Sequence, residues 1–61
     1  MEFEKALKNL KNGCAISRKS WGERALFFNE KINEIEDDNK TKISSWKPNQ
    51  EDILAEDWEL I

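Results

Sequence analysis

The strongest constraint on this fold is that its 61 residues include a single cysteine, Cys14, and no histidine. A chain of about 60 residues buries only roughly 60% of the surface that its unfolded form exposes, so it forms one small domain of marginal stability. Such chains often need disulfides, a bound metal or a partner subunit. One cysteine cannot form an internal disulfide, and neither a cysteine nor a histidine zinc site can be assembled. We therefore expect one domain over residues 1–61, stabilised as a homo-oligomer.

The charge balance and the lack of long apolar runs argue against two classes of partner. The chain has 13 acidic against 10 basic residues, a net charge of −3, so it lacks the positive field that duplex nucleic acid requires. No apolar run approaches the length of a membrane span or of a signal-peptide core. The unpaired thiol is typical of a reducing compartment. The sequence therefore indicates a cytoplasmic protein that binds neither duplex nucleic acid nor a membrane.

The first half of the chain predicts one helix and two strands. Apolar residues with the spacing of one helical face occur in residues 1–13: Phe3, Ala6, Leu7 and Leu10. Asn12-Gly13 supplies a left-handed stop for this helix. Residues 14–19 alternate as in a short strand, which Ser20-Trp21-Gly22 ends. Residues 23–29 are apolar on both sides, so we expect a second strand that is covered on both faces, with another subunit as the natural cover.

The middle of the chain is ambiguous between a helix and a hairpin. Ile32 and Ile35 fit a helical spacing, whereas Asp37-Asp38-Asn39 followed by Thr41 and Ile43 fits the turn and return strand of a hairpin, which we favour. Four carboxylates in this segment raise the question of calcium, but the central glycine and the closing glutamate of an EF-hand are missing. We expect a solvated loop there. The four residues are Glu34, Glu36, Asp37 and Asp38.

The last 16 residues predict a capped helix and a final strand. Asn49 is placed as an N-cap with Asp52 three residues later, a variant of the capping box, so a short helix is expected at about residues 50–55. Ile53 and Leu54 are expected to face the core, and Trp58 alternates with acidic residues as a strand would. The predicted fold class is α+β, with an N-terminal helix packed on a small antiparallel β-sheet and a short second helix before the last strand.

Catalysis has little support in these residues. There is no histidine, no glycine-rich phosphate loop and no nucleophile elbow, and Cys14 has no evident base that would make it a thiolate. We therefore expect no enzyme activity, no cofactor and no metal site.

Nucleotide binding has better support. Arg18, Lys19 and Arg24 flank Trp21, so an aromatic plane and three cations lie within seven residues. An indole can stack on a base, a guanidinium can bind a phosphate, and a carboxylate such as Asp57 can accept hydrogen bonds from ribose hydroxyls. The same residues also have structural explanations. Three tryptophans in so short a chain are most simply its core.

Two stretches of the chain resemble a known family. EFEKALKNLKNGCAISRKSW is similar to the family's opening pattern F-x-x-A-L-x-x-L-K-x-G, a strand, and R-K-x-W. WKPNQEDILAEDWELI resembles its closing pattern, in which a tryptophan is followed by Gln, Asp, an apolar pair, Ala, an acid or amide, Asp and Trp. The family is the second Thoeris anti-defence family of small phage proteins, which is related to a type II anti-CRISPR family.

The resemblance implies a phage protein that works in the cytoplasm of the infected bacterial host as a sponge. It would bind and sequester a cyclic nucleotide immune signal, of the glycocyclic ADP-ribose type or a cyclic dinucleotide, without cleaving it, as a dimer or tetramer with pockets between subunits. Trp21 and Trp46 would stack on the base, whereas Trp58 is expected in the core. The three cations would neutralise phosphates, and Asn49, Asp52 and Asp57 would bind ribose or base edges. The expected contact residues are Arg18, Lys19, Trp21, Arg24, Trp46, Asn49, Asp52 and Asp57.

This sequence departs from the family pattern after Trp21. The family continues with Asn-Gly-Lys-Gly, whereas Gly22, Glu23 and Arg24 follow here, and the middle of the chain is shorter than in many members. The main alternative function is an anti-CRISPR or other protein-binding inhibitor of a host nuclease, which would use the acidic residues 34–38 against a basic channel. A structural oligomer without a ligand would instead leave Trp21 buried and Arg18 paired within its own subunit.

Overall fold

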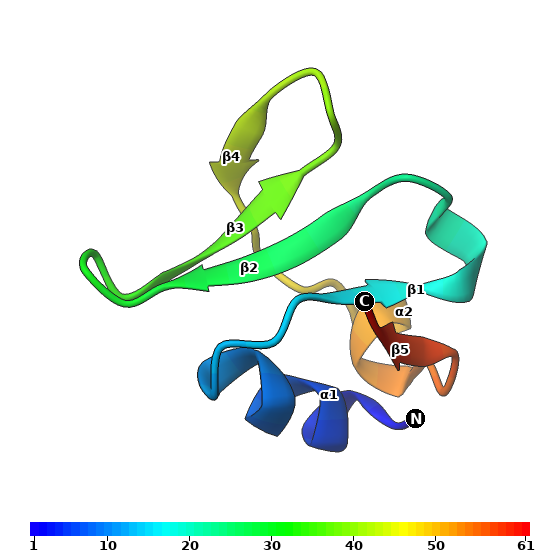
Figure 1. The fold of residues 1–61 in the computed structure, drawn as a ribbon. Coiled ribbons are helices and arrows are strands. Elements are labelled where there is room, and N and C mark those ends of the chain that lie inside the picture. Colours follow the sequence, from blue (N-terminus) through cyan, green and yellow to red (C-terminus); the bar gives the residue numbers. More distant parts are fainter.

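A computed structural model describes all 61 residues and shows an α+β fold, with two α-helices on one face of a five-stranded antiparallel sheet (Figure 1). This is the predicted fold class. The elements in chain order are α1 (Phe3–Lys11), β1 (Ile16–Arg18), the 3₁₀ helix η1 (Lys19–Trp21), β2 (Ala25–Asn29), β3 (Glu34–Asp38), β4 (Ile43–Ser45), α2 (Gln50–Leu54) and β5 (Trp58–Leu60). Neither α-helix has the length and apolar character that crossing a membrane requires.

The helix α1 begins and ends where the sequence predicts. Lys8 and Lys11 occupy its last turn, where cations favour the negative end of the helix dipole. Gly13 then adopts a φ of 100°, a left-handed conformation that glycine reaches without steric cost. Its amide donates to the carbonyl of Leu10, which satisfies one of the free carbonyls at the helix end.

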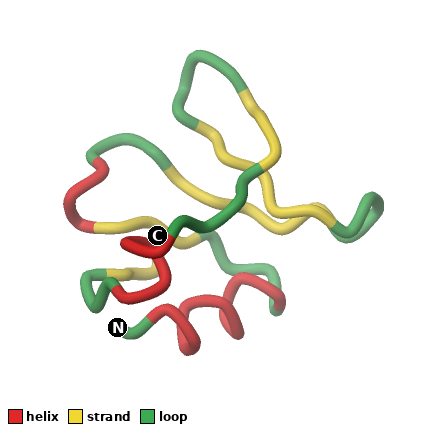
Figure 2. Tube along the Cα trace, turned by 180° about the vertical axis from the view of Figure 1, so that it is seen from behind, coloured by secondary structure: helices red, strands yellow, loops and turns green.

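The strand order is β4-β3-β2-β1-β5, so the first strand lies between the second and the last. Ile16 of β1 pairs with Leu26 of β2 on one side and with Leu60 of β5 on the other. The hairpin predicted for the middle of the chain is confirmed as β3 and β4, with Asp38 opposite Ile43. Figure 2, seen from behind, shows this hairpin extending away from the helices.

The acidic segment of residues 34–38 is a strand and not the solvated loop that the sequence suggested. It forms β3 and pairs along its whole length with β2, from Asn29 opposite Glu34 to Ala25 opposite Asp38. The loop prediction was wrong because a strand tolerates acids when hydrogen-bond donors from its neighbours reach them. Each of its four carboxylates accepts a hydrogen bond from the chain itself. The donors are Ser45 to Glu34, Asn29 to Glu36, Arg24 to Asp37, and the Lys40 amide to Asp38.

The core lies between the sheet and α1, which packs against β5, β2 and β1. Residues that pair across strands share a face of the sheet, so Leu26 and Ile16 face α1 together. The buried apolar residues are Ala6, Leu10, Ile16, Leu26, Trp46 and Trp58. All of them except Trp46 belong to α1, β1, β2 or β5, whereas Trp46 lies in the chain that follows β4.

The opposite face of the sheet has no helix on it and is called here the open face. Phe27 points to this face from β2 and is 44% exposed, whereas its neighbour Leu26 on the helix side is fully buried. Ala25 and Ser45 share the open face with Phe27 by alternation and strand pairing. Within one subunit, therefore, β2 is covered on one side only, and the second cover expected from its sequence is not found in the subunit.

The helix α2 is capped as predicted but buries a different residue. The Asn49 side chain accepts from the Asp52 amide at 2.8 Å, and the Asp52 carboxylate accepts from the Asn49 amide at 3.3 Å, which completes a capping box. Asp52 is buried, whereas Ile53 and Leu54 are 49% and 69% exposed. The expectation that these two residues face the core was wrong, because the capping box and an ion pair turn the Asp52 side of the helix inward.

Candidate functional site

Trp58 is at the centre of a cluster of four aromatic rings. Its ring centroid lies 5.1 Å from that of Trp21, 5.5 Å from Phe3 and 6.2 Å from Trp46. The indole Nε1 of Trp58 donates to the carbonyl of Asp52 at 3.0 Å, so the ring also holds the end of α2. The rings of Trp21 and Trp46 meet Trp58 edge to face, a favourable aromatic geometry.

Trp21 lies at the surface side of this cluster and is only partly buried. The guanidinium carbon of Arg24 lies 4.0 Å from the centre of the Trp21 ring, within the range of a cation–π contact. The same guanidinium forms two parallel hydrogen bonds to Asp37, Nε to Oδ1 at 3.0 Å and Nη2 to Oδ2 at 2.8 Å. Trp21, Arg24 and Asp37 therefore form one unit, in which the guanidinium lies over the indole and is held in place by the carboxylate.

Arg18 forms ion pairs with three carboxylates. Its Nε donates to Asp57 at 2.8 Å, and its Nη1 donates to Asp52 at 3.2 Å and to Glu51 at 3.3 Å. The Arg18 side chain is 11% exposed and Asp52 is 8% exposed, so that pair is largely removed from water. The network connects β1, α2 and the start of β5. A phosphate that bound Arg18 would have to displace one of these carboxylates.

The hydrogen bond from Arg18 lowers the pKa of Asp57 below its ordinary value, although partial burial acts in the opposite direction. The same hydrogen bond is the main reason that the pKa of Arg18 is raised. Both shifts favour the charged pair. The two groups therefore remain ionised over the whole physiological range of pH.

The other predicted contact residues lie in different surroundings. Lys19 is exposed at the start of η1 and forms no ion pair. Trp46 is 8% exposed and belongs to the core, which is the structural alternative that its sequence position left open. Asn49 is exposed but uses its side-chain oxygen as the helix cap. The structure thus brings Trp21, Lys19 and Arg24 to one surface region and gives the remaining predicted residues contacts inside the subunit.

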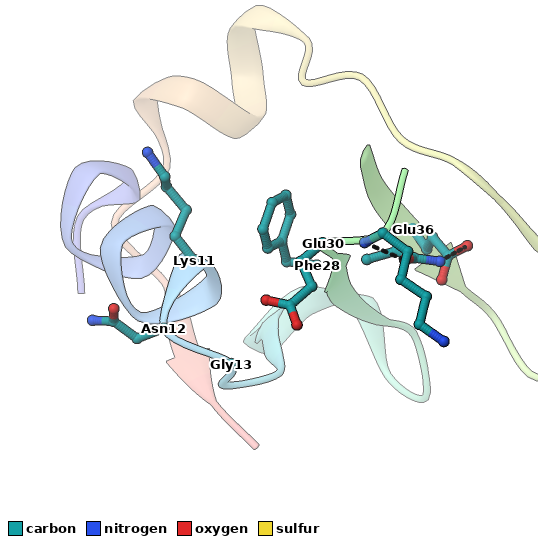
Figure 3. Close-up of a pocket in the computed structure, with 8 residues that line it drawn as sticks. Lys11, Asn12, Gly13, Phe28, Glu30 and Glu36 are labelled. Atoms are coloured by element: carbon teal, nitrogen blue, oxygen red, sulfur yellow. Dashed lines mark hydrogen bonds between the residues drawn. The ribbon is translucent and has the colours of Figure 1, made fainter. Parts of the chain in front are cut away.

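The largest hollow of the surface is elsewhere. It has a volume of about 560 Å³ and lies between the end of α1 and the β2–β3 turn. Figure 3 shows the Phe28 ring between Lys11 on α1 and Glu36 on β3. Phe28 is its one apolar wall, and none of the eight predicted contact residues lines it. No single hollow of the subunit therefore joins Trp21 to the predicted phosphate and ribose contacts.

The sequence analysis did not place two residues of these networks at the candidate site. Asp37 binds Arg24 across the β2–β3 pair, and Glu51 is the third carboxylate around Arg18. One local signal could have placed Asp37. It lies two residues after the apolar Ile35, so alternation along the strand puts both side chains on the same face of the sheet, which is the face of Leu26. Glu51 carries no such signal, because its contact depends on how α2 docks on β1.

Comparison with known proteins assigns this chain to a family. A Thoeris anti-defense 2-like domain matches residues 1–61, the whole chain. The chain is also similar to a protein of Bacillus phage SP01 named Thoeris anti-defense 2, with 34% identity over an alignment that covers 100% of this chain and 94% of the phage protein. The alignment spans 84 positions, more than the 61 residues of this chain, so the phage protein carries insertions relative to it. The chain belongs to the Thoeris anti-defense 2-like family, and its role is phage anti-defence.

Proposed function

We propose that this protein is a non-catalytic sponge that binds a cyclic nucleotide immune signal in the cytoplasm of the infected host and withholds it from its receptor. The signal would be of the glycocyclic ADP-ribose type or a cyclic dinucleotide. The observation that carries the proposal is the Trp21–Arg24 stack at the surface of a member of an anti-defence family. An aromatic ring with a cation over it and a second cation beside it suits a base joined to phosphates.

Three of the predicted residues are the best candidates for direct contacts from this subunit. Trp21, which is partly exposed, would stack on a base, and Lys19, which has no ion-pair partner, would meet a phosphate. Arg24 would either keep its ion pair with Asp37 and hold the indole in place, or release Asp37 and bind a phosphate. Both are possible because the guanidinium can form two parallel hydrogen bonds to a carboxylate or to a phosphate.

The ligand roles of the other predicted residues remain predictions. Arg18 and the acids Asp52 and Asp57 hold one another, and Asn49 caps α2. We propose that they act mainly by fixing η1, and hence Trp21, on the sheet. The Lys19 amide donates to the Asp57 carbonyl at 3.1 Å, which ties the start of η1 to the start of β5.

A sponge also needs a partner subunit. To outcompete a receptor, it must bind with a dissociation constant of roughly nanomolar order, about −12 kcal/mol, which calls for a largely enclosed ligand. The Trp21 region is a surface and not a cavity. We therefore propose a homo-oligomer, a dimer or tetramer, in which a second subunit closes the site. The exposed Phe27 on the open face is a suitable anchor for that contact.

Calorimetric titration with a panel of glycocyclic ADP-ribose isomers and cyclic dinucleotides tests the proposal. We expect tight binding of one class, with intact release of the ligand after the protein is denatured by heat. Lys19→Ala should weaken binding at least tenfold, whereas Lys31→Ala, which removes another exposed lysine in the β2–β3 turn, should leave it unchanged. Absence of binding across the panel, or recovery of a cleaved ligand, would refute the sponge.

A further inference from the structure

One buried hydroxyl group lies next to the candidate site and has no role in it so far. Ser17 of β1 is 3% exposed, and it and Asp52 are the two buried polar residues of the chain. Its neighbour Ile16 faces α1, so alternation along the strand turns Ser17 toward the open face. Ser17 is therefore enclosed although it lies on the face that no helix covers, and a buried hydroxyl requires a hydrogen-bond partner.

The partner of this hydroxyl is the backbone of Arg24. The Ser17 hydroxyl donates to the Arg24 carbonyl, the closer of two carbonyls near it, since that of Arg18 lies at 3.4 Å. Residues 19–24, called here the η1 loop, leave the sheet after β1 and return to it at β2 (Figure 1). The hydroxyl therefore ties together the two ends of the η1 loop, the segment that contains the aromatic ring of the candidate site.

The returning end of the η1 loop has few other contacts. Gly22 has a φ of 75° and open space where a Cβ would lie. Glu23 pairs with Lys40 at 2.9 Å, but both side chains are more than half exposed, so this pair holds the loop only weakly. A hollow of about 380 Å³ lies beside these residues and leaves space for movement. The Ser17 hydroxyl is therefore the main tether of the backbone at Arg24.

We propose that Ser17 is a positioning residue, whose hydroxyl fixes the backbone of Arg24 and thereby holds the guanidinium over Trp21. Arg24 is then attached at both ends, by its carbonyl to Ser17 and by its guanidinium to Asp37. Without the hydroxyl, the loop end can shift into the hollow beside it. A displacement of about 1 Å in a supporting contact is enough to weaken a binding site. The consequence for ligand affinity rests on the proposed function, whereas the position of Arg24 does not.

Three substitutions of Ser17 separate the hydroxyl from the volume of the side chain. Ser17→Ala removes the hydroxyl and keeps the Cβ. Ser17→Thr and Ser17→Val are matched in shape, and only threonine keeps the donor. The added methyl group can extend into the hollow that Ser17 lines. The control is Ser44→Ala, which makes the same chemical change at an exposed serine of β4. Circular dichroism confirms that each variant is folded.

Proton–nitrogen NMR spectra of the ligand-free protein measure the position of Arg24 directly. The chain has two arginines and three tryptophans, so each of their side-chain N–H signals can be followed. Exchange of the Arg24 Nε–H with water should be about tenfold or more faster in Ser17→Ala and Ser17→Val, and unchanged in Ser17→Thr and the control. The Nε–H of Arg18 and the indole N–H of Trp58 should not change. A general loss of stability would instead speed exchange at all three groups.

Calorimetric titration with the same panel of glycocyclic ADP-ribose isomers and cyclic dinucleotides measures the consequence for binding. Ser17→Ala and Ser17→Val should bind about tenfold or more weakly than the parent chain, and Ser17→Thr within about threefold of it. Unaltered Arg24 exchange in the alanine and valine variants would overturn the proposal, and so would equal acceleration at Arg18 and Trp58. Unchanged affinity in variants whose Arg24 has moved would overturn its role in binding. A parent chain that binds no member of the panel would refute the sponge instead, and the spectra alone would then decide the assignment of Ser17.

Discussion

Replacing Trp58 by phenylalanine should destabilise this protein far more than the same replacement at Trp21. Phenylalanine keeps a ring in the aromatic cluster at both positions and removes the indole nitrogen and part of the ring volume. At Trp58, which is 1% exposed, the lost N–H is the partner of the Asp52 carbonyl at the end of α2. At Trp21 the ring is half-buried, and its nitrogen donates to no group of the chain.

The magnitude follows from these contacts. A buried carbonyl left without its partner costs about 1–3 kcal/mol. The smaller ring adds about 1 kcal/mol or more through lost burial and the space it leaves. Trp58→Phe should therefore cost about 2–4 kcal/mol, a large part of the roughly 3–9 kcal/mol expected for a domain of this size. Trp21→Phe should cost below about 1 kcal/mol, since a phenyl ring still contacts Trp58 and Arg24.

Urea unfolding followed by far-ultraviolet circular dichroism measures both changes without relying on tryptophan emission. Protein concentrations must be matched, because an oligomer gains apparent stability with concentration. In thermal unfolding, Trp58→Phe should lower Tm by about 10–30 °C. Equal losses at the two positions would refute the assignment of Trp58 to the core and Trp21 to the surface. They would also remove the main support for Trp21 as a ligand contact.

Three other changes test single features of the fold. The lowered pKa of Asp57 means that its pair with Arg18 stabilises the fold above the ordinary carboxyl pKa, at about pH 4, and that this contribution is lost as pH falls through the folded value. Asp57→Asn should therefore make stability less dependent on pH below about pH 4, as acid titration of the unfolding midpoint would show. Asn49→Ala should cost about 1 kcal/mol and Asn49→Asp much less, and a loss shared by both would argue against a capping role. Gly22 has a φ of 75° with open space where a Cβ would lie, so Gly22→Ala should cost about 1 kcal/mol or more from backbone strain alone, and urea unfolding that shows no loss would contradict this.

Local sequence patterns were sufficient to predict the elements whose boundaries depend only on residues nearby in the chain. The helix over residues 3–11 has an apolar stripe and a glycine stop, and the capping box at Asn49 is complete within four residues. The hairpin of β3 and β4 was also predicted, because its turn chemistry lies between two short strands. In each case the atoms that decide the structure are close in the sequence.

Contacts between distant segments were not predictable in the same way. The sequence places Arg18 beside Trp21, but in the fold Arg18 faces carboxylates 33 to 39 residues away. Likewise, Ile53 and Leu54 have an apolar pattern that suggests burial, yet Asp52 takes the inward position because Asn49 and Arg18 both bind it. A residue that satisfies two polar partners can override the burial of an apolar neighbour, and one sequence does not reveal those partners.

The pairing of β1 with β5 has a consequence for how the protein is made. Ile16 and Leu60 lie opposite each other, and the amino group of Met1 donates to the carbonyl of Trp58 at 2.7 Å. The core therefore closes by joining segments from the two ends of the chain, which raises contact order and slows folding. During synthesis on the ribosome, α1 and β1 are made first and lack their contacts with β5 until that strand has emerged. Folding is thus expected to finish after translation of Trp58, and the incomplete chain exposes an unpaired edge of β1 in the meantime.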